Sequence, residues 1–146
     1  MKALIVSFLL LALSACAITN ENLEPQNDSF SKINGQWKYK KTGVGYPVVN
    51  GPTEIINEKI EILTFDSVNK TFTRSINGQV TETTSFDIQK VNYVGIEPRE
   101  AIIFQKSETY SFLTFDDANS CIILYEKTPV GVVLADGNSY YYQKVK

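Results

Sequence analysis

Short strand-like runs separated by turn residues are the feature that most constrains how this chain can fold. From residue 32 onward these runs are rich in β-branched and aromatic residues, and no stretch has the apolar spacing of an amphipathic helix. The runs that predict strands are 36–41, 55–65, 70–76, 79–89, 101–106, 110–115, 120–126 and 139–145, with 130–134 as a candidate ninth strand. The pattern therefore predicts an all-β fold.

The connections between the runs indicate how the strands are arranged. Asn77-Gly78 is a strong hairpin signal, because a type I′ turn requires a positive φ at both central residues. Consecutive hairpins without a long crossover predict an eight-stranded antiparallel up-and-down barrel, in which closure removes the exposed sheet edges. A β-sandwich is the alternative. Residues 42–54 contain three glycines and two prolines, and this longer loop is predicted to act as a lid.

The first residues have the features of a secretory signal. A positive start at Lys2 precedes an apolar run over residues 3–13, which is too short to span a bilayer as a helix. The run ends in Leu-Ser-Ala-Cys, with the cysteine at Cys16, and this ending resembles the lipobox of bacterial lipoproteins. The resemblance implies a signal peptide over residues 1–15 and a lipid anchor on Cys16, with a diacylglycerol thioether and an acyl chain such as palmitate. An ordinary signal peptide with Cys16 as a free thiol is the alternative.

The segment after the anchor predicts a tether and a location. Residues 16–31 are polar and aperiodic, which is typical of a flexible tether, so the barrel domain is predicted over 32–146. Ala17 stands where an Asp would retain a lipoprotein at the inner membrane of well-studied Gram-negative bacteria. The expected location is therefore the cell envelope, with a lipid anchor in the outer membrane.

Charge and composition exclude several function classes. Lys2 is the only charged residue in 1–15, so the 14 basic side chains of the full chain become 13 against 16 acidic ones, which is no footprint for nucleic acid. The chain has no histidine and therefore no Ser-His or Cys-His dyad and no histidine metal site. Asp116-Asp117 falls short of a calcium ligand set and predicts a solvated turn. Cys121 is predicted to be a small buried side chain. We expect no enzyme activity, no cofactor and no metal.

Aromatic residues supply a candidate interior. Strand alternation places Trp37, Tyr39 and Lys41 on one face of the first strand, and Phe72 and Arg74 on one face of the third. Trp37 is expected to plug one end of the barrel, with a pocket contact as the alternative. The candidate ligand-binding residues are Trp37, Tyr39, Phe72, Phe86, Phe104, Phe112, Tyr125 and Tyr142.

Several motifs together resemble a known family. GQW at residues 35–37 resembles the Gly-x-Trp of the first lipocalin strand, and EILTF, FTRSINGQ and ADGNSYYYQKV follow in the order found in small lipocalin-like lipoproteins of Gram-negative bacteria. The resemblance covers roughly residues 33–145. It implies a lipocalin-like barrel that binds apolar ligands, with Lys144 in place of the arginine that packs over the tryptophan.

Two main functions remain open from the sequence. The first is a lipid-anchored, non-catalytic barrel that binds a small apolar or amphipathic ligand. The second is a protein-binding barrel, either a hydrolase inhibitor or an accessory subunit of an envelope complex, because similar barrels serve both roles. A structural envelope protein with a filled interior is a third option.

Overall fold

The computed structural model describes residues 28–45, 51–92, 97–134 and 136–146. The predicted signal peptide, Cys16 and residues 17–27 of the predicted tether lie outside the described residues, as does part of the predicted lid at 46–50. The elements are α1 (Asp28–Ile33), β1 (Gly35–Gly43), β2 (Glu54–Ile55), β3 (Glu61–Asp66), β4 (Thr71–Ile76), β5 (Gln79–Val91), β6 (Arg99–Phe104), β7 (Thr109–Asp116), η1 (Asp117–Asn119), β8 (Cys121–Tyr125), β9 (Thr128–Pro129) and β10 (Ser139–Lys144). Within these described ranges, neither helix is long and apolar enough to cross a membrane.

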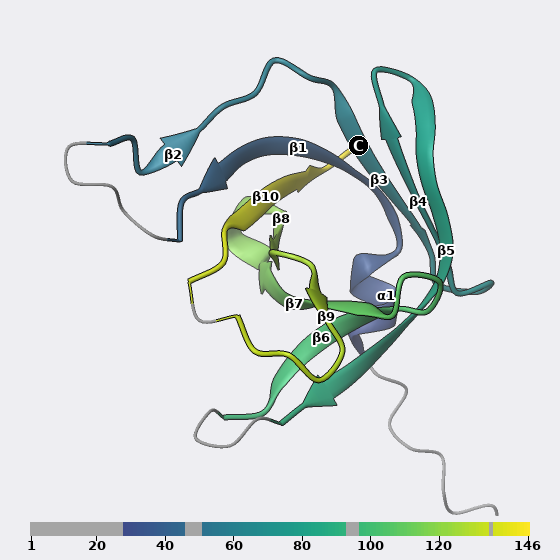
Figure 1. Cartoon of the computed structure of the whole chain (residues 1–146). Helices are drawn as coiled ribbons and strands as arrows, with labels where there is room; N and C mark the ends of the chain where they lie inside the picture. The colour runs from purple at the N-terminus through teal and green to yellow at the C-terminus, as the bar shows by residue number, and fades with distance from the viewer. Residues whose placement is uncertain (1–27, 46–50, 93–96, 135) are drawn as a thin grey trace, which may run out of the picture.

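Eight antiparallel strands form a closed ring (Figure 1). Their order is β1-β3-β4-β5-β6-β7-β8-β10, and pairing of β10 with β1 closes the barrel. The predicted eight-stranded barrel is therefore confirmed. The predicted hairpin at Asn77-Gly78 joins β4 to β5, and both residues have a positive φ, of 52° and 81°. β2 and β9 lie outside the ring, paired with β1 and β7.

Tightly packed phenylalanines fill one half of the barrel. Phe65, Phe72, Phe86 and Phe104, here called the phenylalanine stack, are each at most 1% exposed. Ring centroids lie 5.3 Å apart for Phe65 and Phe86, 5.0 Å for Phe65 and Phe72, and 4.9 Å for Phe72 and Phe104. Such pairs add about 0.5–1.5 kcal/mol each beyond their area burial. This half of the interior is therefore a solid core.

The short helix α1 covers the filled half, which we call the closed end. Ile33 is fully buried, and its carbonyl oxygen accepts a 2.6 Å hydrogen bond from the indole Nε1 of Trp37. Lys144 Nζ lies 5.1 Å from the centre of the Trp37 ring and donates to the carbonyl of Lys32 at 3.2 Å. Trp37 thus lies at the closed end, with Lys144 over its ring.

α1 also corrects the predicted start of the domain. Composition predicts a flexible tether up to residue 31, but residues 28–31 belong to α1. Ser29 donates a 2.6 Å hydrogen bond to Glu100 on β6, and the Phe30 ring lies 5.9 Å from that of Phe86. Phe30 and Ile33 give this segment an apolar face, which is too short to stand out as a periodic pattern in the sequence.

Three strand predictions also need correction. The predicted strand 55–65 is interrupted, because β2 and β3 pair with opposite ends of β1 and residues 56–60 leave the sheet. A register shift between Tyr39 and Lys41 turns Thr42 inward in place of Lys41. The candidate ninth strand at 130–134 is not a strand, because β9 ends at Pro129, one residue before that range.

Candidate functional site

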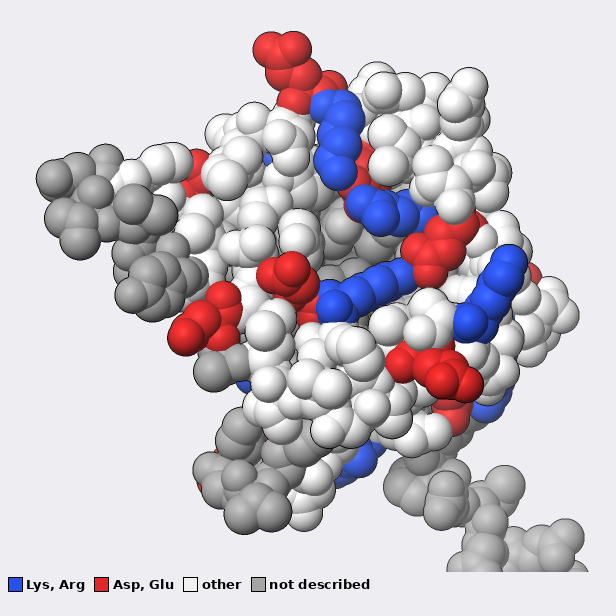
Figure 2. Space-filling view, in the orientation of Figure 1, with Lys and Arg blue, Asp and Glu red and all other residues white. Residues whose placement is uncertain are grey.

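A cavity of about 340 Å³ opens at the end of the barrel opposite α1, which we call the open end. Figure 2 views this end and shows basic and acidic side chains around a central hollow. Its floor includes Leu63, Leu124 and two rings of the phenylalanine stack, Phe72 and Phe104. The floor is apolar, and charged side chains form part of the wall above it.

Five charged side chains, here called the charge cluster, gather at this end: Lys59, Glu61, Arg74, Glu82 and Lys127. Glu61, the first residue of β3, is only 2% exposed. Arg74, on the neighbouring strand β4, donates from Nε to Oε1 of Glu61 at 2.9 Å and from Nη2 to Oε2 at 3.1 Å. Lys59 Nζ lies 2.7 Å from Oε2. The β3–β4 register pairs Arg74 with the inward-facing Leu63. The side chains of Arg74 and Glu61 therefore both lie inside the barrel.

Tyr142 completes the environment of Glu61. Its phenolic hydroxyl donates a 2.9 Å hydrogen bond to Oε1. Burial alone would raise the pKa of Glu61, but hydrogen bonds from Arg74, Lys59 and Tyr142 outweigh it and hold the pKa below its ordinary value. Burial and the adjacent Glu61 charge raise the pKa of Tyr142 far above its ordinary value. Glu61 is therefore a fixed negative charge at neutral pH.

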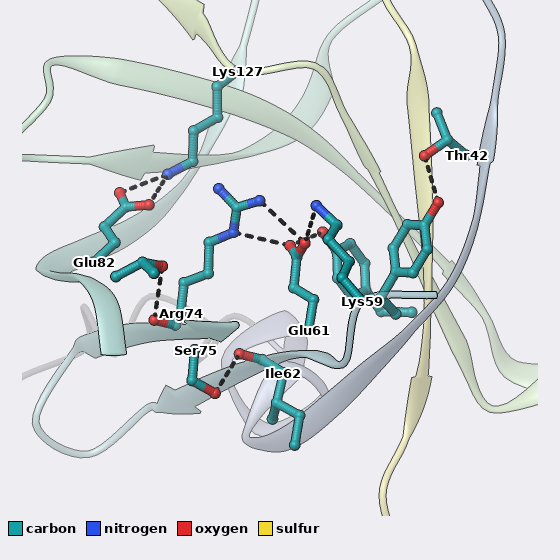
Figure 3. Close-up of polar contacts among 11 residues, drawn as sticks. Thr42, Lys59, Glu61, Ile62, Arg74, Ser75, Glu82 and Lys127 are labelled. Atoms are coloured by element: carbon teal, nitrogen blue, oxygen red, sulfur yellow. Dashed lines mark hydrogen bonds and ion pairs between the residues drawn. The ribbon is translucent and has the colours of Figure 1, made fainter. Parts of the chain in front are cut away.

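Lys127 spans the open end from the segment after β8 to β5. Its Nζ lies 2.6 Å and 2.8 Å from the two carboxylate oxygens of Glu82, and 3.9 Å from the centre of the Phe104 ring. Burial lowers the pKa of Lys127, and the hydrogen bond to Glu82 opposes that shift. Figure 3 shows the Arg74 guanidinium between the Lys127–Glu82 pair and the Glu61–Lys59 pair. The cluster is thus continuous along one side of the cavity.

The predicted ligand-binding residues divide into three groups. Tyr39, Phe72, Phe104, Tyr125 and Tyr142 contribute to the cavity wall or floor. Two others, Trp37 and Phe86, are buried in the closed end and do not line the cavity. Phe112 lies outside the barrel, because its neighbours along β7, Ser111 and Leu113, are the residues that turn inward.

The prediction of an interior position is therefore wrong for Phe112, whereas Tyr125 borders the cavity although its ring lies on the outer face of β8. The two rings face each other at 6.5 Å on the outer surface, where β7 and β8 are neighbours. The Arg99 guanidinium lies 4.8 Å from the Phe112 ring and 4.6 Å from the Tyr125 ring. Both faces of this part of the sheet carry aromatics, so composition alone could not indicate which face is inward.

Sequence reasoning missed the charge cluster as a functional feature. Alternation did place Arg74 on the same face as Phe72, and Glu61 has the same parity as the buried Leu63 and Phe65. A buried charge needs a partner, so an inward Arg and an inward Glu on successive strands were an available signal. Lys127 lies outside the regular strands, and nothing local in the sequence points it into the barrel.

The arrangement is suited to holding a molecule that has both polar and apolar parts. Its carboxylates are occupied by cations, which leaves Glu61 poorly placed as a proton acceptor. Within the described ranges, no three His, Cys, Asp or Glu side chains come close enough to hold a metal ion. Asp116 instead caps η1 by accepting from Asn119, and burial raises the pKa of the half-buried Cys121 thiol.

Comparison with known proteins assigns no family to this chain. The chain matches no protein-family model, no curated protein and no solved structure.

Proposed function

We propose that this protein is a non-catalytic binding protein that holds a small amphipathic molecule in the open end of its barrel. The observation that carries the proposal is the cavity of about 340 Å³, which combines an apolar floor with a charged wall. Ligand pockets in proteins have volumes of about 300–1,000 Å³, so this one is at the small end of the range. At roughly 30 Å³ per water molecule, it has room for about eleven waters or a ligand of similar size.

The chemistry of the wall supports binding rather than catalysis. A general acid or base works best with a pKa near the operating pH. The cationic partners of Glu61 instead hold its pKa below the ordinary value, and therefore further from neutral pH. Permanent charges over an apolar floor are suited to orienting a ligand.

We further propose that the protein is anchored in the outer membrane by lipid on Cys16. The support is the sequence alone: an apolar run followed by Leu-Ser-Ala-Cys. Two or more acyl chains give stable membrane attachment, since each buried methylene contributes about 0.8 kcal/mol. Intact mass spectrometry of the protein from its own membranes tests this. We expect loss of residues 1–15 and addition of lipid, and a C16S variant should lack the lipid. An unmodified Cys16 in the mature protein would refute the anchor.

Native mass spectrometry of the gently extracted protein tests ligand binding. We expect a noncovalently bound mass that is lost on collisional activation. Leu124→Phe narrows the cavity, whereas Ile123→Phe adds the same kind of ring on the outer face of β8 as a matched control. The bound mass should disappear in the first variant and persist in the second. Equal retention in both variants would place the ligand elsewhere.

One observation favours a protein partner as the second candidate. Val130, Val132, Val133 and Leu134 form an exposed apolar segment after β9, with 46–58% of each residue accessible. Such surfaces occur at protein interfaces. Chemical cross-linking in the envelope tests this function, and we expect a Val132→Asp substitution to abolish any cross-linked partner that docks on this segment.

A further inference from the structure

We propose that the ligand of the open-end cavity is a short-chain amphiphile carrying a single negative charge, with a carboxylate head group that contacts Arg74 and Lys59. The inference rests on the proposed ligand-binding function and specifies its chemical class. Three observations carry it: the charge balance of the cluster, the donors that remain available, and the depth of the cavity.

The charge cluster has an excess of one positive charge. Lys59, Arg74 and Lys127 face the carboxylates of Glu61 and Glu82. Arg74 and Lys59 share Glu61, while Lys127 is paired with Glu82. The side chains of the three cations are 34–35% exposed, so they are partly desolvated and a ligand can reach them. One monovalent anion would neutralise the cluster.

Hydrogen-bond donors remain on the same two cations. Arg74 uses Nε and Nη2 for Glu61, and Nη1 has no hydrogen-bond partner among the described residues. Figure 3 shows this terminal nitrogen on the far side of the guanidinium from Glu61. Lys59 makes one ion pair and has further hydrogens to donate. A carboxylate beside Arg74 and Lys59 would therefore gain charge-assisted hydrogen bonds.

The remaining acid of the cavity wall lies on another part of the ring. Glu126 follows β8, which is separated from β4 by three strands in either direction around the barrel. Its Oε2 accepts a 3.0 Å hydrogen bond from the backbone N–H of Asn138. Glu126 thus directs an anionic head group away from its own side and toward Arg74.

The phenylalanine stack limits the length of the ligand. Phe72 and Phe104 form the floor, and Phe65 and Phe86 fill the space beneath it with less than 2% exposure. An alkyl chain that starts at Arg74 meets this floor after a short distance. Additional methylenes must extend toward solvent, where they gain little burial.

Isothermal titration calorimetry on the purified full chain tests the proposal. The probes are octanoate, octylammonium and octanol, which share one alkyl chain but differ in charge, together with decanoate and dodecanoate. We expect octanoate to bind at least tenfold more tightly than octylammonium or octanol. We also expect less than a twofold gain per added methylene beyond octanoate, whereas a deep apolar pocket would give about fourfold.

Lys59→Met removes the excess charge, and Lys38→Met makes the same change on the outer face of β1. The first variant should weaken octanoate binding about tenfold and leave octanol binding unchanged, which also shows that the cavity is intact. Lys127→Met also removes the excess positive charge of the cluster, and we expect the same loss of octanoate affinity. Lys38→Met should bind as the unsubstituted protein does.

The outcomes separate this inference from the function on which it rests. If octanol or octylammonium binds as tightly as octanoate, the cavity binds ligands but the charge assignment is wrong. If affinity rises about fourfold per methylene up to dodecanoate, the length limit is wrong. If none of the probes binds, the ligand-binding function itself is overturned.

Discussion

Tyr142 on β10 donates a hydrogen bond of 2.9 Å to Glu61 on β3, and the two residues are 81 positions apart in the chain. The contact joins the last strand of the barrel to its second ring strand, next to β1, which lies between them. Glu61 is 2% exposed and Tyr142 is 5% exposed. A buried carboxylate therefore holds together strands from both ends of the folded domain.

Removal of the Tyr142 hydroxyl should destabilise the barrel. Hydrogen bonds to charged groups contribute about 1.5–3 kcal/mol, and Tyr142→Phe deletes one while keeping the ring. We expect a loss of about 2 kcal/mol in the free energy of unfolding, measured by urea denaturation. Tyr141→Phe, on the outer face of the same strand, is the matched control and should change stability by less than about 0.5 kcal/mol. Equal effects of the two substitutions would contradict a special role for this bond.

Neutralising Glu61 should cost more than neutralising an exposed acid. Glu61→Gln leaves Arg74 and Lys59 without their carboxylate, and breaking a buried ion pair costs about 3–5 kcal/mol. Because both cations are about one-third exposed, we expect a loss near the lower limit, about 3 kcal/mol. Glu54→Gln disrupts the exposed pair with Lys41 and should cost less than about 1 kcal/mol. Chemical denaturation of both variants gives the comparison, and a smaller loss in Glu61→Gln than in Glu54→Gln would refute it.

Stability should fall in acid, in part through Glu61. Its folded-state pKa is lowered, so its contribution is fully present above the unfolded pKa of about 4.3 and disappears as the pH falls through the folded value. The difference in stability between the unsubstituted protein and Glu61→Gln should therefore be constant from pH 7 to about pH 5 and shrink below about pH 4. Urea titrations across this range measure it. A difference that grows in acid would mean that the folded-state pKa is raised instead.

The segment α1 should contribute to folding. Ile33 is fully buried beneath Trp37, and Ile→Ala substitutions in cores cost about 2–5 kcal/mol. We expect Ile33→Ala to lower stability by about 3 kcal/mol in thermal or urea denaturation. Val68→Ala, at a position 87% exposed, is the control and should have almost no effect. A small loss at Ile33 would show that packing of α1 against the closed end contributes little to folding.

The barrel itself could be predicted from the sequence because its signals are local. Strands such as β3 and β8 are short runs with period-two alternation, and Asn77-Gly78 specifies a hairpin without help from distant residues. Predictions failed where distant contacts override the local pattern. The shift between Tyr39 and Lys41 depends on pairing with β10, about a hundred residues later, and it reverses which side chain faces inward.

The candidate site could be predicted only in part. Phe72 and Phe104 follow from alternation, as does the inward position of Arg74. The charge cluster also requires Lys59 and Lys127, and these lie in irregular segments that only the closed barrel brings to the open end. The sequence does not indicate the outward position of Phe112, because β7 carries aromatic or apolar residues on both sides.

The central claim, that the open end of the barrel binds the ligand, is tested most directly by amide chemical-shift mapping of the ¹⁵N-labelled protein during titration with octanoate. We expect the largest shifts at Glu61, Arg74 and Leu124, with little change at the Trp37 indole and at Phe86 in the closed end. Shifts concentrated at Trp37, or on the outer surface around Arg99, would contradict the claim, as would a spectrum that octanoate leaves unchanged.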